Sequence, residues 1–232
     1  MAEVVQIVAS ANPKSALDIG CGPGSFSIAL AAAADGCAVT GIDINPAFLE
    51  RARSSCAKAS LKGTVELLHA RPIDVESRRF DVVVCIGASQ AIGEPDSAVE
   101  WALSRLNDGG LLVLGEGYWR ASPSAEYLAG LGGSASDFRL LDEQRRFLEG
   151  RGLTLLHEAV ASAEAWEAYE RGVHQGRLQF AESLSGEEAV TVRQQADAWI
   201  RLYEEHGRHF LGFAVFVGQC RSSSAVVSGP RL

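Results

Sequence analysis

A glycine-rich turn between two short apolar segments constrains the fold of this 232-residue chain more than any other feature. The turn contains Gly20, Gly22 and Gly24. The apolar segment 16–19 precedes it, a helical segment over 25–34 follows it, and a second apolar segment, 38–42, ends in Asp43. Glycine has no Cβ atom, so the chain can turn sharply here and a ligand can approach the backbone. This order of elements predicts an α/β fold with a ligand site at the carboxyl ends of its strands, and Asp43 lies at that edge.

Apolar and amphipathic segments alternate along most of the chain, which predicts a doubly wound, mostly parallel sheet. The expected strands cover 15–19, 38–42, 64–68, 80–86, 111–114, 153–160 and 210–217. The expected helices cover 2–10, 25–34, 46–59, 96–106, 142–149, 163–183 and 186–206. Asn45 and Pro46 favour a helix start, because Asn caps backbone N–H groups and Pro is tolerated at the first helical position.

The same pattern predicts a single domain over 1–220 and a Ser-rich, disordered tail over 221–232. Two amphipathic helices between the sixth and seventh strands form a segment that is longer than a connection requires. We interpret this segment, 162–207, as a helical insert that acts as a lid or recognises a substrate. Residues 118–137 are rich in Pro, Gly and Ser and are expected to form a loop with short helical pieces.

Charge and cysteine usage disfavour several other classes of protein. The net charge is −8 and no run of Lys and Arg occurs, which disfavours a nucleic-acid partner. No stretch has the length of a transmembrane helix and no signal peptide is evident, so we expect a cytoplasmic protein without a membrane partner. Five scattered cysteines without a C-x-x-C pair argue against a zinc site or a disulfide framework, and no metal site is expected.

The spacing of the glycines separates the turn from two other nucleotide-binding motifs. A dinucleotide-binding turn needs glycine at the sixth position, where this chain has Ser25, and a P-loop needs a Gly-Lys-Ser/Thr sequence that is absent. The pattern is D-x-G-x-G-x-G over 18–24, followed by Asp43 at the end of the next strand. This combination resembles the class I S-adenosylmethionine-dependent methyltransferases. An α/β domain with a glycine-rich turn and no ligand is the alternative.

The resemblance implies a Rossmann-like fold of seven strands, in which the seventh lies antiparallel between the fifth and the sixth. It also implies S-adenosylmethionine as the cofactor, with Asp18 and the glycine turn at its amino-acid end, Asp43 at the ribose and Ile44 against the adenine. The backbone near Ile86 and Gly87 is expected to lie beside the sulfonium of the cofactor. The complete set expected at the cofactor is Asp18, Gly20, Cys21, Gly22, Gly24, Asp43, Ile44, Ala70, Arg71, Cys85, Ile86 and Gly87.

The segment expected at the adenine departs from the family pattern. The family often has an acid just after the third strand, and this chain has Arg71 near that position. Either backbone atoms of Ala70 and Arg71 contact the adenine, or Asp74 reaches back to it. We favour the backbone interpretation, in which Asp74 is an ordinary surface acid.

The acceptor site is expected in the segments after the fourth and fifth strands and in the helical insert. The candidate catalytic residues are Glu116, Tyr118 and His174, and the candidate substrate residues are Ser89, Gln90, Trp119, Trp166 and Tyr169. Glu116 could act as a base or anchor a cationic group, and a structural ion pair with Arg120 is the alternative. For the aromatic residues and the histidine the alternatives are ordinary packing and a surface position. The Gly-Glu-Gly-Tyr-Trp sequence at 115–119 resembles a branch of small bacterial enzymes of this family.

The predicted activity is transfer of a methyl group from S-adenosylmethionine to a small molecule by direct in-line displacement, with an N, O, S or C nucleophile. The motifs that family members use on nucleic-acid bases after the fourth strand, (Asn/Asp)-Pro-Pro-(Tyr/Phe) and Pro-Cys, are absent. The alternatives are a non-catalytic protein that binds the cofactor, an enzyme that uses it without net methyl transfer, and an RNA or protein methyltransferase. The sequence is compatible with a monomer or a homodimer.

Overall fold

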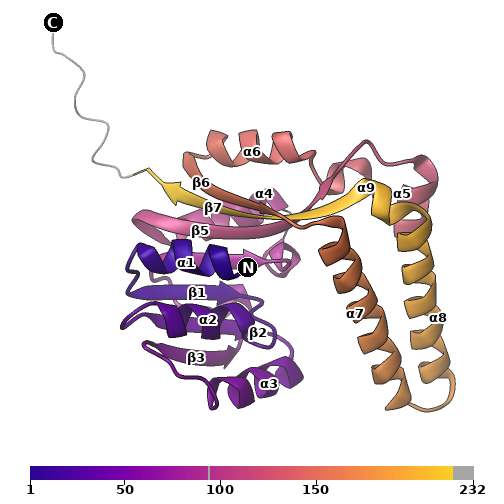
Figure 1. The fold of residues 1–232 in the computed structure, drawn as a ribbon, viewed down its shortest axis with the longest axis horizontal. Helices are drawn as coiled ribbons and strands as arrows, with labels where there is room; N and C mark the ends of the chain where they lie inside the picture. The colour runs from indigo at the N-terminus through magenta and orange to yellow at the C-terminus, as the bar shows by residue number, and fades with distance from the viewer. Residues whose placement is uncertain (94, 222–232) are drawn as a thin grey trace, which may run out of the picture. The chain divides into compact units, whose positions relative to one another are not determined.

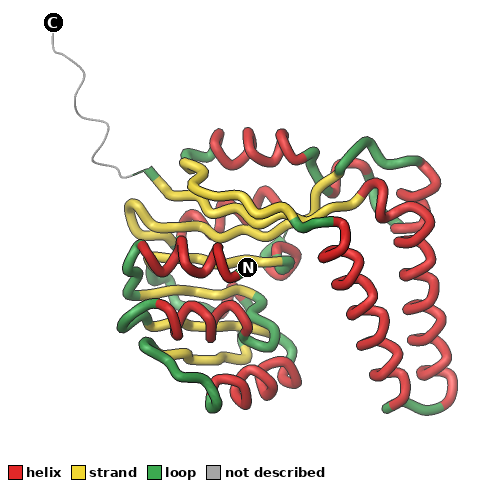
Figure 2. Tube along the Cα trace, viewed as in Figure 1, coloured by secondary structure: helices red, strands yellow, loops and turns green. Residues whose placement is uncertain are grey.

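The computed structural model describes residues 1–93 and 95–221, and its strands form a seven-stranded sheet (Figure 1). The strands are β1 (Ser15–Ile19), β2 (Ala38–Asp43), β3 (Thr64–His69), β4 (Phe80–Ile86), β5 (Leu106–Trp119), β6 (Leu153–Val160) and β7 (Leu211–Cys220). The helices of the described residues are α1 (Ala2–Ser10), α2 (Ser25–Ala33), α3 (Pro46–Cys56), α4 (Pro95–Ser104), α5 (Ala125–Leu131), α6 (Leu141–Gly150), α7 (Ala163–Glu182), α8 (Gly186–Leu202) and α9 (Arg208–Phe210). Figure 2 shows how helices and strands alternate along the chain.

The strand order confirms the predicted fold class. The order is β3-β2-β1-β4-β5-β7-β6, so β7 lies between β5 and β6 as the family resemblance implies. β1 to β5 pair in parallel through β2–β3, β1–β2, β1–β4 and β4–β5. In Figure 1 the arrow of β7 points in the opposite direction to that of β1. The chain therefore has a mixed, mostly parallel, doubly wound sheet with a helical region before its last strand.

The central strands are buried because their sequences are apolar on both faces. Leu17 of β1 and Val82 and Val83 of β4 have no exposed surface, as expected for central strands of a parallel sheet covered on both faces. The predicted start of α3 is also confirmed. The side chain of Asn45 accepts hydrogen bonds from the N–H groups of Ala47 and Phe48, and Pro46 occupies the first helical position.

The fifth strand is longer than the sequence predicted. The prediction limited it to 111–114, because Asn-Asp-Gly-Gly at 107–110 is a typical turn sequence. In the register with β4, the paired residues of β5 skip from Leu106 to Leu111. Residues 107–110 therefore form a bulge within the strand rather than a turn before it. At its other end β5 continues to Trp119, so the Gly-Glu-Gly-Tyr-Trp sequence lies inside β5 and not after it.

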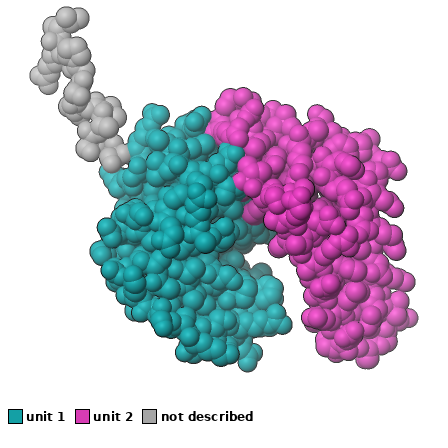
Figure 3. Space-filling view, in the orientation of Figure 1, with its two compact units in different colours: residues 1–116, 147–159, 215–232 teal, residues 117–146, 160–214 magenta. Residues whose placement is uncertain are grey.

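The contacts divide the chain into two compact units, which are coloured separately in Figure 3. Unit 1 comprises the described residues of 1–116, 147–159 and 215–221, and unit 2 comprises residues 117–146 and 160–214. The helical insert predicted at 162–207 lies in unit 2, and the predicted disordered tail lies outside the described residues from 222 onward. The domain division stays a prediction. None of the helices in the described ranges is long and apolar enough to cross a bilayer.

Candidate functional site

The carboxyl ends of β1, β2 and β4 bring the motif residues together in unit 1. In the parallel register Asp18 lies opposite Gly41 of β2 and Val84 of β4. The glycine turn, Asp43 and the segment after β4 therefore begin at neighbouring strand ends. This edge of an open α/β sheet is where such folds bind ligands.

The backbone geometry of the turn explains its glycines. The φ angles of Gly20, Gly22 and Gly24 are +62°, +54° and +79°, a region that residues with side chains rarely adopt. A Cβ atom on Gly20 would lie 2.4 Å from Cβ of Ala88, and one on Gly24 would lie 3.0 Å from Cβ of Ala52. A Cβ atom on Gly22 would have no atom of the described residues within 4 Å. Gly20 and Gly24 are thus required by packing, whereas Gly22 borders open space.

Asp43 connects the end of β2 to the glycine turn. Its Oδ2 accepts a hydrogen bond from the N–H of Gly22 at 2.8 Å, and its Oδ1 accepts one from the N–H of Asn45 at 2.8 Å. The N–H of Cys21 also donates to the carbonyl of Ile42 at 3.0 Å. Each carboxylate oxygen has two lone pairs, so both can accept a further hydrogen bond. Asp43 therefore shapes the turn and keeps acceptor capacity for a ligand.

Asp18 is a buried acid at the base of the turn. Its side chain is 3% exposed, and the hydroxyl of Ser27 on α2 donates to its Oδ2 at 2.6 Å. Burial raises the pKa of Asp18 from 3.8 to about 7, although hydrogen bonds from Ser27 act in the opposite direction. A carboxylate in such surroundings is stabilised by a cationic group that binds beside it.

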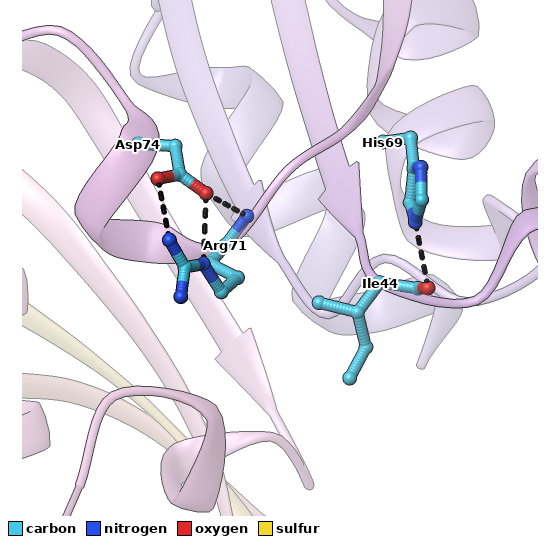
Figure 4. A network of polar contacts seen from close by, with 4 residues as sticks. All are labelled: Ile44, His69, Arg71 and Asp74. Carbon is cyan, nitrogen blue, oxygen red and sulfur yellow. Dashed lines mark hydrogen bonds and ion pairs between the residues drawn. The ribbon is translucent and has the colours of Figure 1, made fainter.

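The segment after β3 is held by two sets of polar contacts, which Figure 4 shows. Nε2 of His69 lies 2.9 Å from the carbonyl oxygen of Ile44, whose side chain is 63% exposed. The guanidinium of Arg71 donates to both carboxylate oxygens of Asp74, each at 3.0 Å, and the backbone N–H of Arg71 donates to Oδ2 at 3.1 Å. The N–H of Ala70 donates to the carbonyl of Asp43 at 3.2 Å. Of the backbone atoms predicted to contact the adenine, the N–H groups of Ala70 and Arg71 are thus engaged within the protein.

The segment after β4 completes this edge of unit 1. Cys85 is buried, and burial, followed by the negative charge of Glu116, raises the pKa of its thiol to about 12. Gly87 has a φ of +64° and donates its N–H to the carbonyl of Gly115 at 2.8 Å. Ile86 pairs with the same residue in the sheet. The thiol of Cys85 is therefore neutral, and Glu116 and Asp18 are ionisable groups near it.

The two polar candidates for substrate contact in this segment differ in exposure. Ser89 is 5% exposed, and Nε2 of the exposed Gln90 donates to the carbonyl of Gly87 at 3.3 Å. Gln90 is thus the one of the pair that a ligand can reach without a rearrangement of the loop.

The remaining predicted residues lie in unit 2. Trp119 belongs to a core cluster with Tyr127 and Leu211, and its indole N–H donates to the carbonyl of Ala135 at 2.8 Å. The ring of Tyr118 lies where a Cβ atom on Gly212 would be, at 2.5 Å from Cζ. Both side chains are less than 8% exposed. Their roles at a substrate stay predictions, and the observed contacts of Trp119 are those of a packing residue.

Two predicted residues of α7 form an aromatic stack, whereas His174 makes a helix–helix contact. The ring of Trp166 stacks on Tyr169 at 5.0 Å and on Phe213 at 5.3 Å between centroids, and Tyr169 is 58% exposed. Nε2 of His174 lies 2.9 Å from a carboxylate oxygen of Asp197 on α8. Within unit 2 Tyr169 is therefore accessible, and the imidazole of His174 is engaged.

Sequence reasoning missed several polar residues. Ser27 contacts Asp18, and His69 contacts the backbone beside Asp43. In unit 2, the carboxylate of Glu170 is 3% exposed and accepts a hydrogen bond from the indole of Trp199 at 2.8 Å, and burial raises its pKa. The only available signal was a polar residue in an otherwise apolar stretch, such as Ser27 between Phe26 and Ile28.

Comparisons with known proteins agree with this geometry. A family model described as a methyltransferase domain matches residues 17–112. The protein YjhP of Escherichia coli is 28% identical over 204 residues, which cover 86% of this chain and 82% of YjhP. The crystal structure of YjhP has a TM-score of 0.86 at 25% identity and covers 95% of this chain and 91% of its own.

Two further relatives have methyltransferase activities in their names. An S-adenosylmethionine-dependent methyltransferase of Geobacter sulfurreducens, solved with S-adenosylhomocysteine, has a TM-score of 0.84 at 25% identity, over 95% of this chain and 90% of that one. A ubiquinone biosynthesis O-methyltransferase of Psychrobacter arcticus is 32% identical over 133 residues. That match covers 56% of this chain and 49% of the relative, so the chain spans about half of that enzyme.

The fold, the strand-end geometry and these comparisons define the class of the protein. The protein is an S-adenosylmethionine-dependent methyltransferase with the fold of the class I enzymes, and its cofactor is S-adenosylmethionine. The residues present fit that cofactor, because the turn has an open side at Gly22, its backbone is bonded to the carboxylate of Asp43, and it follows the strand of the buried acid Asp18. The predicted branch within the family stays a prediction.

Proposed function

We propose that the turn at Gly20–Gly24, Asp43 and Asp18 bind S-adenosylmethionine, and that the enzyme methylates a small molecule. The observation that carries this proposal is the open side of Gly22, whose N–H donates to Asp43, in a turn that directly follows the strand of the buried Asp18. When bound, S-adenosylmethionine supplies a methyl group that is electrophilic because it is attached to a sulfonium. The protein has to bind the cofactor and the acceptor, align them and exclude water. Proximity of this kind lowers the activation barrier by roughly 7–11 kcal/mol in favourable cases.

The residues of unit 1 divide this task by their chemistry. The lone pairs of Asp43 that the backbone does not use accept hydrogen bonds from ribose hydroxyls. Asp18 binds the cationic ammonium of the amino-acid end, since it is a buried acid. The exposed side chain of Ile44 gives the adenine an apolar surface.

The contacts of the segment after β3 narrow the two interpretations of adenine binding. The N–H groups of Ala70 and Arg71 donate within the protein. A hydrogen bond between this backbone and the adenine amino group would therefore be accepted by a carbonyl oxygen. Asp74 binds Arg71 in a bidentate pair and would have to share its oxygens with the adenine. We therefore propose that the carbonyl of Ala70, rather than Asp74, reads the amino group.

The acceptor is proposed to be a small molecule rather than a nucleic acid. The net charge of −8 disfavours a polyanionic substrate, and the names of the O-methyltransferase relatives support a small acceptor. We propose that Glu116 and Gln90 contact the acceptor, because Gln90 lies in the segment after β4 and Glu116 directly follows Gly115, which pairs with Ile86 at the end of β4. The predicted roles of Tyr118, Trp166, Tyr169 and His174 in unit 2 stay predictions.

Compartment and assembly are also proposals. All five cysteines are free thiols in the structure, which supports a reducing, cytoplasmic compartment. We propose a monomer or a homodimer, and sedimentation equilibrium of the purified protein measures which of these forms.

Methyl transfer is tested with labelled S-adenosylmethionine and a fractionated metabolite extract. The expected result is label in a small molecule together with an equal amount of S-adenosylhomocysteine. Binding of S-adenosylmethionine without formation of S-adenosylhomocysteine, or label only in RNA or protein, would contradict the proposed function.

The substitution Asp43→Ala is expected to weaken binding of S-adenosylhomocysteine roughly 100-fold, or about 3 kcal/mol, because two hydrogen bonds to a charged group are lost. It should also lower the free energy of unfolding by about 1–3 kcal/mol, because the N–H groups of Gly22 and Asn45 lose their acceptor. Calorimetric titration and urea unfolding measure the two effects.

Asp81→Ala is the matched control for Asp43→Ala. Asp81 also accepts hydrogen bonds from two backbone N–H groups, those of Lys14 and Ser15, but it lies at the amino end of the same sheet. The control should lose similar stability and bind normally. Equal affinity in both variants would remove Asp43 from the cofactor site.

Glu116→Gln is expected to lower kcat by roughly 100-fold, the scale of a general base, and to change the affinity for S-adenosylhomocysteine by less than about twofold. The control is Glu66→Gln on β3, which replaces an exposed carboxylate outside the strand ends. Turnover by Glu116→Gln equal to that of the control would show that Glu116 has no part in the reaction.

A further inference from the structure

Ser27 has an unusual hydrogen bond for a serine in a helix. It lies in the first turn of α2, directly after the glycine turn, and is completely buried. Serine hydroxyls inside helices commonly bond to the carbonyl of the preceding turn. This one instead donates to Oδ2 of Asp18 on β1, nine residues earlier, at 2.6 Å. A short, buried hydrogen bond to a carboxylate fixes the orientation of that carboxylate.

The other ionisable groups near Asp18 do not favour its charged form. The carboxylate of Asp43 raises the pKa of Asp18, which burial has already raised. Burial, together with the charge of Asp18, raises the pKa of the thiols of Cys21 and Cys85 to about 12, so both are neutral. The hydrogen bonds from Ser27 act in the opposite direction.

We propose that Ser27 is a positioning residue that holds the Asp18 carboxylate oriented and ionised for the ammonium group of the cofactor. The inference rests on the proposed role of Asp18 and extends it to a residue that contacts no ligand itself. A residue that acts in this way should affect only ligands that carry the amino-acid end. It should also have no effect once Asp18 has lost its charge.

The first test is calorimetric titration of wild type and Ser27→Ala with two ligands. S-adenosylhomocysteine carries the amino-acid end, whereas 5′-methylthioadenosine has the same nucleoside without it. Ser27→Ala should lower the affinity for S-adenosylhomocysteine roughly tenfold, the scale of one hydrogen bond to a charged group. The affinity for 5′-methylthioadenosine should stay within about twofold of the wild-type value. Equal weakening of both ligands, or of neither, would overturn the proposal. Failure of wild type to bind either ligand would instead overturn the proposed function.

The second test is a double-mutant cycle with Asp18→Asn. If Ser27 acts through the charge of Asp18, Ser27→Ala in the Asp18→Asn background should change the affinity for S-adenosylhomocysteine by less than about twofold. A tenfold loss in that background would show that Ser27 acts by another route.

The pH dependence gives a third readout. Affinity of wild type for S-adenosylhomocysteine should rise as the pH increases through about 7, where Asp18 ionises. In Ser27→Ala the midpoint of this rise should move to higher pH, because a donor that stabilises the carboxylate is gone. An unchanged midpoint would count against the proposal.

Discussion

Replacing Asp18 with asparagine should make the protein more stable above pH 7 and, at the same time, weaken binding of S-adenosylhomocysteine at least tenfold. The displacement of the Asp18 pKa from 3.8 to about 7 corresponds to a free energy on the order of 4 kcal/mol. That figure is the upper limit of the expected gain in the free energy of unfolding. An Asn side chain has nearly the same shape and can still accept the hydrogen bond from Ser27.

The sign of the effect follows from proton linkage. The pKa of Asp18 is higher in the folded than in the unfolded protein, so the folded state binds more protons between pH 4 and pH 7. Its favourable contribution is complete below about pH 4 and is lost as the pH rises through about 7. Since Asp18→Asn does not titrate, its advantage over wild type should be small at pH 4 and largest at pH 8.

Asp81→Asn serves as the opposite case in the same sheet. Burial raises the pKa of Asp81, but hydrogen bonds from Asn107, Lys14 and Ser15 outweigh burial, and the net pKa is lowered. This variant should therefore lose stability above pH 4 and bind the ligand normally. Urea unfolding at pH 4, 6 and 8 measures both variants. A loss of stability at pH 8 in Asp18→Asn, like that expected for Asp81→Asn, would contradict the account of Asp18 as a functional acid whose ionised form destabilises the folded protein.

Gly22→Val should abolish binding of S-adenosylhomocysteine, with a loss of at least about 100-fold, while the protein still folds. A Cβ atom at this position meets no atom of the described part of the chain within 4 Å, so the added side chain occupies open space. That space is where we place the cofactor. The cost in stability is the left-handed φ of +54°, about 1–2 kcal/mol.

Gly36→Val isolates the cost of backbone strain. Gly36 has a φ of +68°, its added Cβ atom would also be free of described neighbours within 4 Å, and it precedes β2 at the opposite end of the strand from Asp43. Both variants should lose similar stability, and only Gly22→Val should lose binding. Normal affinity in Gly22→Val would show that the ligand does not lie against the turn.

The sequence predicted the features that depend on local residue types. Local residue types determine three features: the glycine turn, the Asn45–Pro46 helix start and the buried strand β4. The structure has all three. The length of β5 was not predictable in the same way, because the turn-forming residues at 107–110 are accommodated by pairing with β4. A bulge of this kind depends on a partner strand that is distant in sequence.

The contacts of site residues were also beyond local reasoning. The hydrogen bond from Ser27 to Asp18 and the bidentate pair of Arg71 and Asp74 need the folded chain to be recognised. The burial of Trp119 in a core cluster depends on the packing of residues far along the chain. Motif spacing identified which residue types gather at the strand ends, and tertiary packing decided which of their atoms stay available.

The most direct test of the central claim is a crystal structure of the protein grown with S-adenosylhomocysteine. The ligand should lie against Gly22, with its ribose hydroxyls within hydrogen-bonding distance of Asp43 and its ammonium group beside Asp18. Ligand density anywhere else, or none at a saturating concentration, would contradict the assignment of the glycine turn, Asp18 and Asp43 as the cofactor site.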